Sequence, residues 1–314
     1  MKHRAAGNRA NIGQVLKYAA VTVAMLSVLS CAFGFGRSFW NTLLEKAGVA
    51  HFAYAVSDDE LNIHILNVGK ADAIIIESPE VSILVDTGTA DMASTVGDYL
   101  KKRDIDTLDA VLISHGDSDH SGGLGYISDS VSVRELVHSP YFETDIRFDT
   151  EVIAKAGDTL RYGDISIEVM GPIRKYAEEN DNSMVFRLSF HDFSMLFCGD
   201  IEKTAENDLI NSGIDLSTDV LKVAHHGSNS STSEAWLTAT EPECAVISVG
   251  EDNNLLPRNS VLKRLSDAGV EVLRTDLDGS CVISTDGSNI KILTENTGKT
   301  TVLERSNNNE KNDN

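Results

Sequence analysis

Four side chains that can bind divalent metal ions lie within six residues. The apolar run 110–113 predicts a strand, and the loop that follows it contains His115, Asp117, Asp119 and His120. This spacing lets His115 and Asp117 face one ion while the other two side chains face a second. Two ions roughly 4 Å apart are the usual apparatus for clamping a phosphoryl or acyl centre. A solvated turn is the alternative, because turns favour Asp, Ser and Gly, but candidate ligands further along the chain favour a metal site.

Two more candidate ligands follow predicted strands. Asp200 comes after an apolar run, where a carboxylate without a partner would be costly to bury. Its alternative role is to cap the helix predicted at 202–211. His225 opens the sequence His-His-Gly-Ser at 225–228. A lone histidine after a strand is more often a core residue, but the pair with Gly and Ser behind it favours a ligand.

The composition excludes several classes of protein. The chain of 314 residues has a formal net charge of −21, which argues against broad attraction to nucleic acid, since such binding depends on Lys and Arg that neutralise phosphates. A polyanionic substrate would have to be attracted by metal ions and a local basic patch. The four cysteines show neither CxxC spacing nor a dense framework, so neither a zinc ribbon nor a disulfide-stapled domain is indicated.

The N-terminal part of the chain predicts a membrane anchor. Residues 1–17 are basic, and residues 18–36 form an uncharged, apolar segment just long enough to span a bilayer. The positive charge keeps the first segment in the cytoplasm. We therefore expect a single-pass protein of a bacterial cell membrane with an extracytoplasmic C-terminal domain. Cleavage or lipidation at Cys31, giving a secreted protein or a lipoprotein, is less favoured, and a buried helix of a soluble core is the structural alternative.

The rest of the chain is expected to form a linker, a folded domain and a tail. The linker covers 37–60, the domain 61–295, and the tail 296–314 is too polar to pack and is predicted to be disordered. In the domain, short β-rich runs come first and an amphipathic helix is predicted at 91–103. The order of strands followed by a helix recurs in the second half, where strands and helices alternate. This pattern predicts an α/β protein, specifically a four-layer αββα sandwich.

Together these pieces resemble the metallo-β-lactamase fold family, and within it the extracytoplasmic hydrolase domain of ComEC-type DNA-uptake competence proteins. The resemblance runs from about residue 61 to residue 293. Its pieces are Val85-Asp86-Thr87-Gly88, the HxDxDH signature at 115–120 followed by Ser121-Gly122-Gly123-Leu124, Asn182-Ser183, Cys198-Gly199-Asp200, His225-His226-Gly227-Ser228 and Arg274-Thr275-Asp276-Leu277-Asp278-Gly279. Each piece is weak alone, but six in this order are specific. We expect a stand-alone, membrane-tethered version of that hydrolase domain.

The resemblance implies two divalent metal ions. The first would be held by His115 and Asp117, the second by Asp119, His120 and His225, and both by Asp200. Asp117 stands where many relatives have histidine, and Asn182 stands near where they place another. Oxygen ligands in place of imidazoles make the first site harder, which shifts its preference from zinc toward manganese. We expect Mn²⁺ or Zn²⁺ and do not rank them.

The expected reaction is hydrolysis of a phosphodiester by a hydroxide that the two metal ions activate. The substrate would be single-stranded DNA or a smaller, nucleotide-like diester, and the sequence identifies no protein partner. Catalytic roles are expected for Asp119, Asp200, Lys222 and His226. Substrate contacts are expected for Asn182, Ser183, Lys222 and Ser228.

Three departures from the family pattern bear on activity. The family's early DVGQGDA motif appears at 67–73 as NVGKADA, which keeps Asp72, and its usual His-Pro appears as Leu256-Pro257, without the histidine. Asp181 interrupts a run that is normally asparagine. These changes affect leaving-group protonation and substrate fit. They leave two alternatives open: hydrolysis of an ester, amide or thioester on the same fold, or a non-catalytic, membrane-tethered binding module.

Overall fold

The computed structural model describes residues 60–250, 255–296 and 300–303. The predicted N-terminal segments, up to residue 59, lie outside these residues, as does most of the predicted tail. Among the helices of the described part, none is long and apolar enough to cross a membrane.

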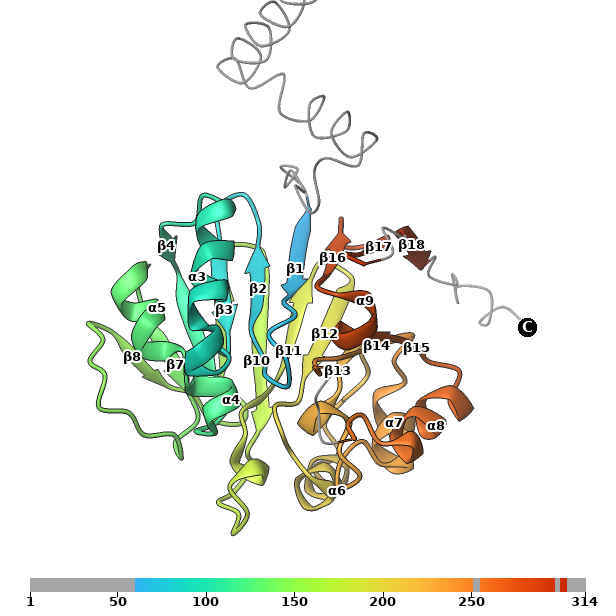
Figure 1. The fold of residues 1–314 in the computed structure, drawn as a ribbon. Coiled ribbons are helices and arrows are strands. Elements are labelled where there is room, and N and C mark those ends of the chain that lie inside the picture. The colour runs from blue at the N-terminus through green and yellow to red at the C-terminus, as the bar shows by residue number, and fades with distance from the viewer. Residues whose placement is uncertain (1–59, 251–254, 297–299, 304–314) are drawn as a thin grey trace, which may run out of the picture. The chain divides into compact units, whose positions relative to one another are not determined.

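One sheet of nine strands carries the first half of the domain and the C-terminal strands (Figure 1). In spatial order its strands are β18 (Thr300–Leu303), β17 (Ile290–Thr294), β16 (Cys281–Thr285), β1 (Leu61–Ile65), β2 (Ile74–Glu77), β3 (Ser82–Val85), β5 (Ala110–Ile113), β7 (Leu136–His138) and β8 (Glu151–Ile153). The strands from β18 to β3 pair antiparallel, and those from β3 to β8 pair parallel. β18 lies within the segment predicted to be a disordered tail, so the sheet extends beyond residue 295.

A second sheet of seven strands carries the rest of the chain. In spatial order its strands are β15 (Glu271–Arg274), β14 (Cys244–Ile247), β13 (Val220–Lys222), β12 (Phe193–Phe197), β11 (Val185–Phe190), β10 (Ile165–Gly171) and β9 (Thr159–Tyr162). The strands from β12 to β15 are parallel, and those from β9 to β12 are antiparallel. Two short strands, β4 (Thr107–Leu108) and β6 (Ser132–Val133), pair separately.

Strands with apolar residues at successive positions bury side chains on both faces of their sheet. In β5, Ala110 and Leu112 belong to the apolar core between the sheets, whereas Val111 and Ile113 belong to the core on the other face. Successive side chains of a strand point to opposite faces, so a run of four apolar residues is the pattern of a strand covered on both sides.

Helices cover the outer face of each sheet. The outer core of the first sheet includes residues of α3 (Ala93–Lys102) and α5 (Leu124–Ser130), and that of the second includes residues of α6 (Lys203–Ser212), α7 (Glu234–Thr240) and α8 (Asn259–Asp267). Figure 1 shows these two helical layers on either side of the paired sheets. The predicted αββα sandwich is therefore confirmed. Short helical turns complete the described part: η1 (Ala90–Met92), α4 (Ser118–Ser121), η2 (Asn180–Asn182), η3 (Ala224–Gly227) and α9 (Thr275–Asp278).

Candidate metal centre

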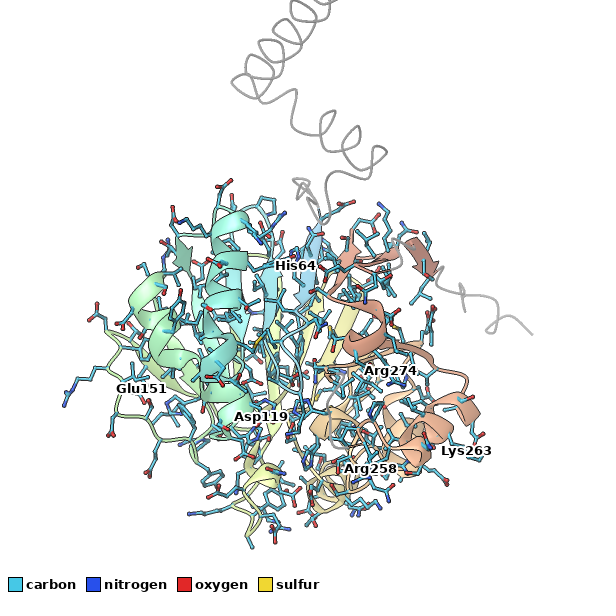
Figure 2. The ribbon with its side chains drawn as sticks, in the orientation of Figure 1. His64, Asp119, Glu151, Arg258, Lys263 and Arg274 are labelled. Atoms are coloured by element: carbon cyan, nitrogen blue, oxygen red, sulfur yellow. The ribbon has the colours of Figure 1, made fainter. Side chains whose placement is uncertain are left out.

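The candidate ligands leave the carboxyl ends of parallel strands in both sheets. The 115–120 loop follows β5, Asp200 follows β12, and His225 and His226 follow β13. Asp117 occupies the N-cap position of α4 without making a capping hydrogen bond, and the single turn of α4 carries Asp119 and His120. Asp119 is labelled in Figure 2, where it lies between the N-terminal and C-terminal halves of the ribbon. Each sheet thus supplies part of one cluster.

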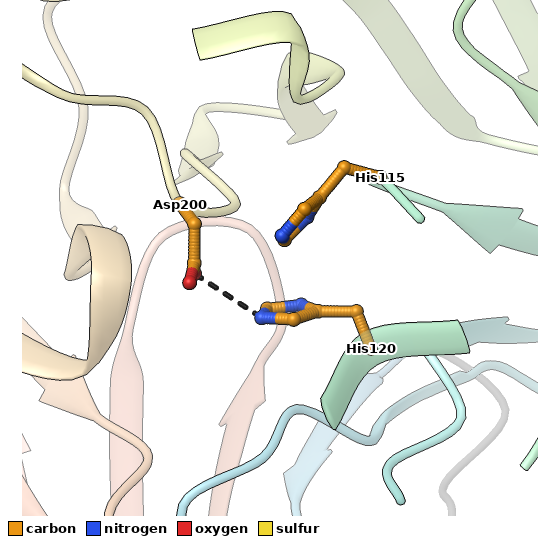
Figure 3. A group of neighbouring side chains, drawn as sticks. All are labelled: His115, His120 and Asp200. Carbon is orange, nitrogen blue, oxygen red and sulfur yellow. Dashed lines mark ion pairs between the residues drawn. The ribbon is translucent and has the colours of Figure 1, made fainter. Parts of the chain in front are cut away.

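His115, His120 and Asp200 form the first potential metal-binding group (Figure 3). All three are buried, and the rings of His115 and His120 are 4.2 Å apart. His120 Nε2 lies 3.1 Å from Asp200 Oδ1. Asp117 stands at the open edge, with a side chain that is 44% exposed and an oxygen 3.7 Å from His115 Nε2.

Asp119, His120 and His226 form the second group. His226 is fully buried, and its Nε2 lies 3.4 Å from Asp119 Oδ2 and 3.8 Å from Asp200 Oδ2. His225 lies farther out, with a side chain that is 21% exposed and an Nε2 atom 3.8 Å from Asp200 Oδ2. The structure thus brings His226, and not His225, together with Asp119 and His120.

The donor atoms at the centre of this cluster suit divalent metal ions. Four buried atoms in it have no well-oriented hydrogen bond to any described residue, namely His115 Nε2, His120 Nε2, His226 Nε2 and Asp200 Oδ1, although His120 Nε2 and Asp200 Oδ1 face each other as an ion pair. Buried polar atoms are almost always hydrogen-bonded, because burial without a partner is costly. Imidazole nitrogens and carboxylate oxygens are the donors that Zn²⁺ and Mn²⁺ accept. The residues present therefore fit such ions.

The opposite ring nitrogens of these histidines are held in place. The Nδ1 contacts are His115 with Ser114 Oγ at 3.1 Å, His120 with Asp86 Oδ2 at 2.8 Å and His226 with the Ser248 carbonyl oxygen at 2.8 Å. A hydrogen bond at Nδ1 fixes the ring orientation and leaves Nε2 available as a ligand. Asp86 is fixed in turn by the Ser114 backbone N–H and hydroxyl, each at 2.8 Å.

The charges of the cluster are mutually stabilising. Burial lowers the pKa of His120, but the carboxylates of Asp200 and Asp86 raise it well above its ordinary value. Burial raises the pKa of Asp200, but the neighbouring His120 and His226 hold it well below its usual range. The carboxylate is therefore ionised at neutral pH, the form that binds metal ions.

Lys222 is buried beneath the cluster. Its position in β13 points it to the inter-sheet face, where Nζ lies 2.8 Å from Asp72 Oδ2. Burial raises the pKa of Asp72, but the neighbouring positive charges, chiefly that of Lys222, outweigh burial and hold the pKa below its ordinary value. Asp72 also donates its backbone N–H to the Asp119 carbonyl oxygen. The Lys222 side chain is 2% exposed, so it supports the loops that carry the ligands and does not face the open side.

Lys70 lies on the open side of Asp119. Its Nζ forms an ion pair with Asp119 Oδ2, and its side chain is 34% exposed. Burial raises the pKa of Asp119, but the nearby His226 and His120 and this ion pair hold it far below its ordinary value. Lys70 is thus a half-exposed cation next to a candidate metal ligand.

Three residues predicted to contact the substrate make hydrogen bonds within the loops. The Asn182 side chain bonds to the backbone of Tyr176 and Glu178, and Ser183 Oγ bonds to the Asn180 carbonyl oxygen and accepts the Asp200 N–H. Ser228 Oγ lies 3.0 Å from Ser230 Oγ. The structure brings these residues near the centre as supports of the ligand loops.

Sequence reasoning assigned no role to three residues of this centre: Lys70, Asp72 and Asp86. Asp86 follows an apolar strand, as Asp200 does, and that signal could have identified it. Asp72 and Lys70 belong to the altered early motif at 67–73. No signal in the sequence indicated that this motif places the cation of Lys70 beside Asp119.

The sequence of this chain is similar to those of known proteins. Residues 66–251 match the model of the metallo-beta-lactamase superfamily. ComE operon protein 3 of Bacillus subtilis (strain 168) is 29% identical over 261 residues, which are 73% of this chain and 34% of that protein. Competence protein ComA of Neisseria gonorrhoeae is 30% identical over 265 residues, which are 83% of this chain and 37% of that protein. The chain therefore spans about a third of the length of these relatives.

Solved structures show the same fold. A mutant of CmlA beta-hydroxylase superposes with a TM-score of 0.50 at 14% identity, covering 74% of this chain and 54% of that one. At this identity the likeness concerns the fold alone, but the family model covers more than half of the sequence, including the 115–120 motif. The chain belongs to the metallo-β-lactamase superfamily.

Proposed function

We propose that this protein is a metal-dependent phosphodiesterase or nuclease that cleaves single-stranded DNA or a smaller phosphodiester. The observation that carries the proposal is the convergence of four buried donor atoms without hydrogen-bond partners at the junction of the two sheets. The similarity to competence proteins favours DNA as the substrate class. The net charge of −21 favours a short substrate that reaches the metals locally.

We assign the ligands as two overlapping sets. The first ion would be held by His115 and Asp117, the second by Asp119, His120 and His226, and both by Asp200. His226 replaces His225 in the second set because it is the histidine whose Nε2 lies 3.4 Å from Asp119. When bound, Mn²⁺ or Zn²⁺ would supply Lewis acidity at the phosphoryl oxygens and acidify water.

The remaining residues bind, orient and move protons. Lys70 carries a charge on the exposed side of Asp119 and can contact a non-bridging phosphoryl oxygen. His225 is partly exposed beside Asp200 and can hold a proton at Nε2 for the leaving oxygen. Lys222, which is buried against Asp72, holds the 67–72 loop in position, and the Asp72 N–H in turn bonds to the 115–120 loop.

The membrane anchor remains part of the proposal. Residues 18–36 would hold the hydrolase domain outside the cytoplasm, which would bring it into contact with external DNA. Protease added to intact cells should then digest the domain while the N-terminal segment stays protected. Protection of the whole chain would contradict this arrangement.

Turnover by the purified full chain tests the activity. With Mn²⁺ or Zn²⁺, the chain should hydrolyse a single-stranded oligonucleotide or bis(p-nitrophenyl) phosphate, and Asp119→Asn should abolish that turnover. Hydrolysis of p-nitrophenyl acetate alone would favour an ester hydrolase on the same fold. Failure to turn over any of the three substrates, with the metals bound, would favour a non-catalytic module.

A further inference from the structure

A cavity at the start of α8 has no role in the mechanism above. It has a volume of about 570 Å³ and is formed by the segment before α8, the first turns of that helix and the end of β15. Its lining residues include Asn229, Leu256, Pro257, Arg258, Asn259 and Arg274. Cavities that hold small organic ligands typically measure about 300–1,000 Å³, so this one can accept a group as large as a nucleotide.

Arg258 gives the cavity a positive charge, whereas the charge of Arg274, the other arginine of its lining, is balanced by Asp276. Arg258 is exposed and makes no side-chain ion pair with any residue in the described ranges. Arg274 is held by Asp276 through Nε and Nη2, at 3.0 and 2.6 Å, which fixes the plane of its guanidinium group. Guanidinium groups are well suited to phosphate, because their N–H groups match its oxygens in pairs. In a chain with a net charge of −21, Arg258 is a local positive charge of the kind that a polyanionic substrate requires.

The cavity also has an apolar wall. Leu256, Pro257 and Leu262 line it together with the arginines, and Leu255 at its rim is 78% exposed. The cavity thus combines apolar side chains with the guanidinium group of Arg258, which has no ion-pair partner among the described residues. A nucleotide has a charged phosphate and a flat, weakly polar base, and therefore complements both parts of this surface.

The backbone connects this cavity directly to the metal centre. The Arg258 N–H donates a 2.9 Å hydrogen bond to the Gly227 carbonyl oxygen, and Gly227 follows His226 in the chain. Pro257 packs on Gly227 so closely that a Cβ atom there would meet the proline ring at 2.5 Å. Figure 2 shows Arg258 and Arg274 on the C-terminal side of Asp119. A strand whose scissile phosphate lay at the metals could thus extend into the cavity.

We propose that this cavity is a subsite for a nucleotide next to the scissile phosphodiester, with Arg258 and Arg274 binding its phosphate and the leucines contacting its base. The inference rests on the proposed function and identifies how an acidic protein would hold a nucleic acid strand. It further assigns Arg258 as a residue that distinguishes a polymeric substrate from a small diester.

Replacing Arg258 should affect long and short substrates differently. Arg258→Ala should raise KM for a single-stranded oligonucleotide about ten-fold, the size expected for the loss of one charge-assisted contact. The kcat/KM for bis(p-nitrophenyl) phosphate should stay within about two-fold, because that diester does not reach the cavity. Arg258→Lys should recover part of the oligonucleotide KM by keeping the charge without the paired N–H groups.

Lys263→Ala is the matched control. Lys263 lies on α8, the helix that Arg258 precedes, is 73% exposed and pairs with Asp267, outside the cavity. Its removal subtracts the same charge and should leave the oligonucleotide KM unchanged. An equal rise in KM for Lys263→Ala and Arg258→Ala would overturn the subsite, because the effect would then be one of overall charge.

A binding measurement separates this inference from the proposed function. Fluorescence anisotropy of a labelled single-stranded oligonucleotide, with EDTA present, reports binding without turnover. Arg258→Ala should weaken this binding about ten-fold and lower the slope of log affinity against log salt by about one. Absence of turnover with the binding difference intact would refute the nuclease and keep the subsite. Equal binding by wild type, Arg258→Ala and Lys263→Ala, or no binding by wild type, would refute the subsite.

Discussion

His225 and His226 are neighbours in the chain, but the turn that carries them gives them different surroundings. Both have left-handed backbone conformations, with φ of 50° and 52°. Such conformations cost about 1–3 kcal/mol each and persist where surrounding contacts enforce them. Here the His225 N–H donates a hydrogen bond to the Gly199 carbonyl oxygen, and His226 Nδ1 donates one to the Ser248 carbonyl oxygen. The strained turn directs His226 into the centre and leaves His225 at the rim.

Alanine substitutions should separate the two histidines. His226→Ala should weaken metal affinity by at least about ten-fold, because it removes a buried ligand beside Asp119. His225→Ala should keep the metal content of wild type and lower kcat. Metal content after dialysis against a dilute chelator, measured by elemental analysis, checks both. Loss of metal from His225→Ala alone would reverse the assignment made from the geometry.

Residue identity and strand order predicted which loops meet at the centre of the site. They did not predict how Lys222, His225 and His226 are placed around it. The 115–120 motif and Asp200 do lie together, because each follows an apolar strand and parallel strands end at one edge. The role of Lys222 depended on the face of β13 on which it lies, and the roles of His225 and His226 depended on backbone angles. Neither property is visible in residue types alone.

At the scale of elements, the contact between the His225–His226 turn and the segment before α8 is tight. Gly227 has φ of 79°, and an added Cβ would meet Pro257 Cβ at 2.5 Å. Gly213, which ends α6, has a similar φ of 74° but open space around it. The two glycines therefore share the backbone requirement and differ in the packing.

Replacing these glycines by alanine should show what the packing contributes. Gly213→Ala should lower the free energy of unfolding by about 1 kcal/mol, the usual effect of a left-handed conformation without glycine. Gly227→Ala should lower it by about 1–3 kcal/mol more, because overpacking is added. It should also reduce metal content, since His226 is displaced. Denaturant unfolding without metal measures the stability of both variants. Equal decreases in the free energy of unfolding would show that Pro257 moves away from the added methyl group at little cost.

A polar network joins β1, β2 and α3 away from the metal centre. Glu77 accepts two hydrogen bonds from Arg103, and its Oε2 lies 3.3 Å from His64 Nε2. His64 Nδ1 lies 3.0 Å from the Tyr99 hydroxyl. Burial raises the pKa of Glu77, but His64 and Arg103 together lower it below its ordinary value of 4.5.

The lowered pKa of Glu77 predicts acid-sensitive stability. The folded state favours the ionised carboxylate, so this contribution is present above pH 4.5 and is lost as the pH falls through the lower pKa of the folded state. Glu77→Gln should therefore lower the free energy of unfolding by about 2 kcal/mol at pH 7. The difference from wild type should shrink as the pH falls below 4.5. Unfolding with EDTA present, from pH 3 to pH 7, measures this; a constant difference would show that the ionised form is not favoured.

For the whole molecule, alternation of short strands and amphipathic helices was enough to predict the sandwich. Boundaries were less accurate, because the end of a strand depends on its partner. β1 ends at Ile65, where its pairing with β16 and β2 ends, although the apolar residues Leu66 and Val68 follow it. The edge strand β18 lies in a segment predicted to be disordered, and its pairing with β17 arises from a register that local composition does not show.

The proposed metal ligands come from both sheets, so bound metal should stabilise the molecule as a cross-link between them. His115 and His120 follow a strand of the first sheet, and Asp200 and His226 follow strands of the second. A ligand present at about 1,000 times its Kd stabilises a fold by about 4 kcal/mol. For a domain of this size, each kcal/mol shifts Tm by about 2–4 °C. EDTA should therefore lower Tm by roughly 10 °C, and Mn²⁺ or Zn²⁺ should restore it.

The Asp200→Asn variant shows whether that shift comes from this centre. Asparagine keeps the shape of the side chain but removes the charge that would bridge the ions, so its Tm should hardly respond to EDTA or to added metal. Without metal, the variant should be less stable than wild type at pH 7, because it removes the ionised carboxylate that His120 and His226 stabilise. An EDTA shift of equal size in both proteins would place the stabilising ion elsewhere. The absence of any shift in wild type would mean that the two sheets meet without a metal cross-link, and that the four orphaned atoms need another partner.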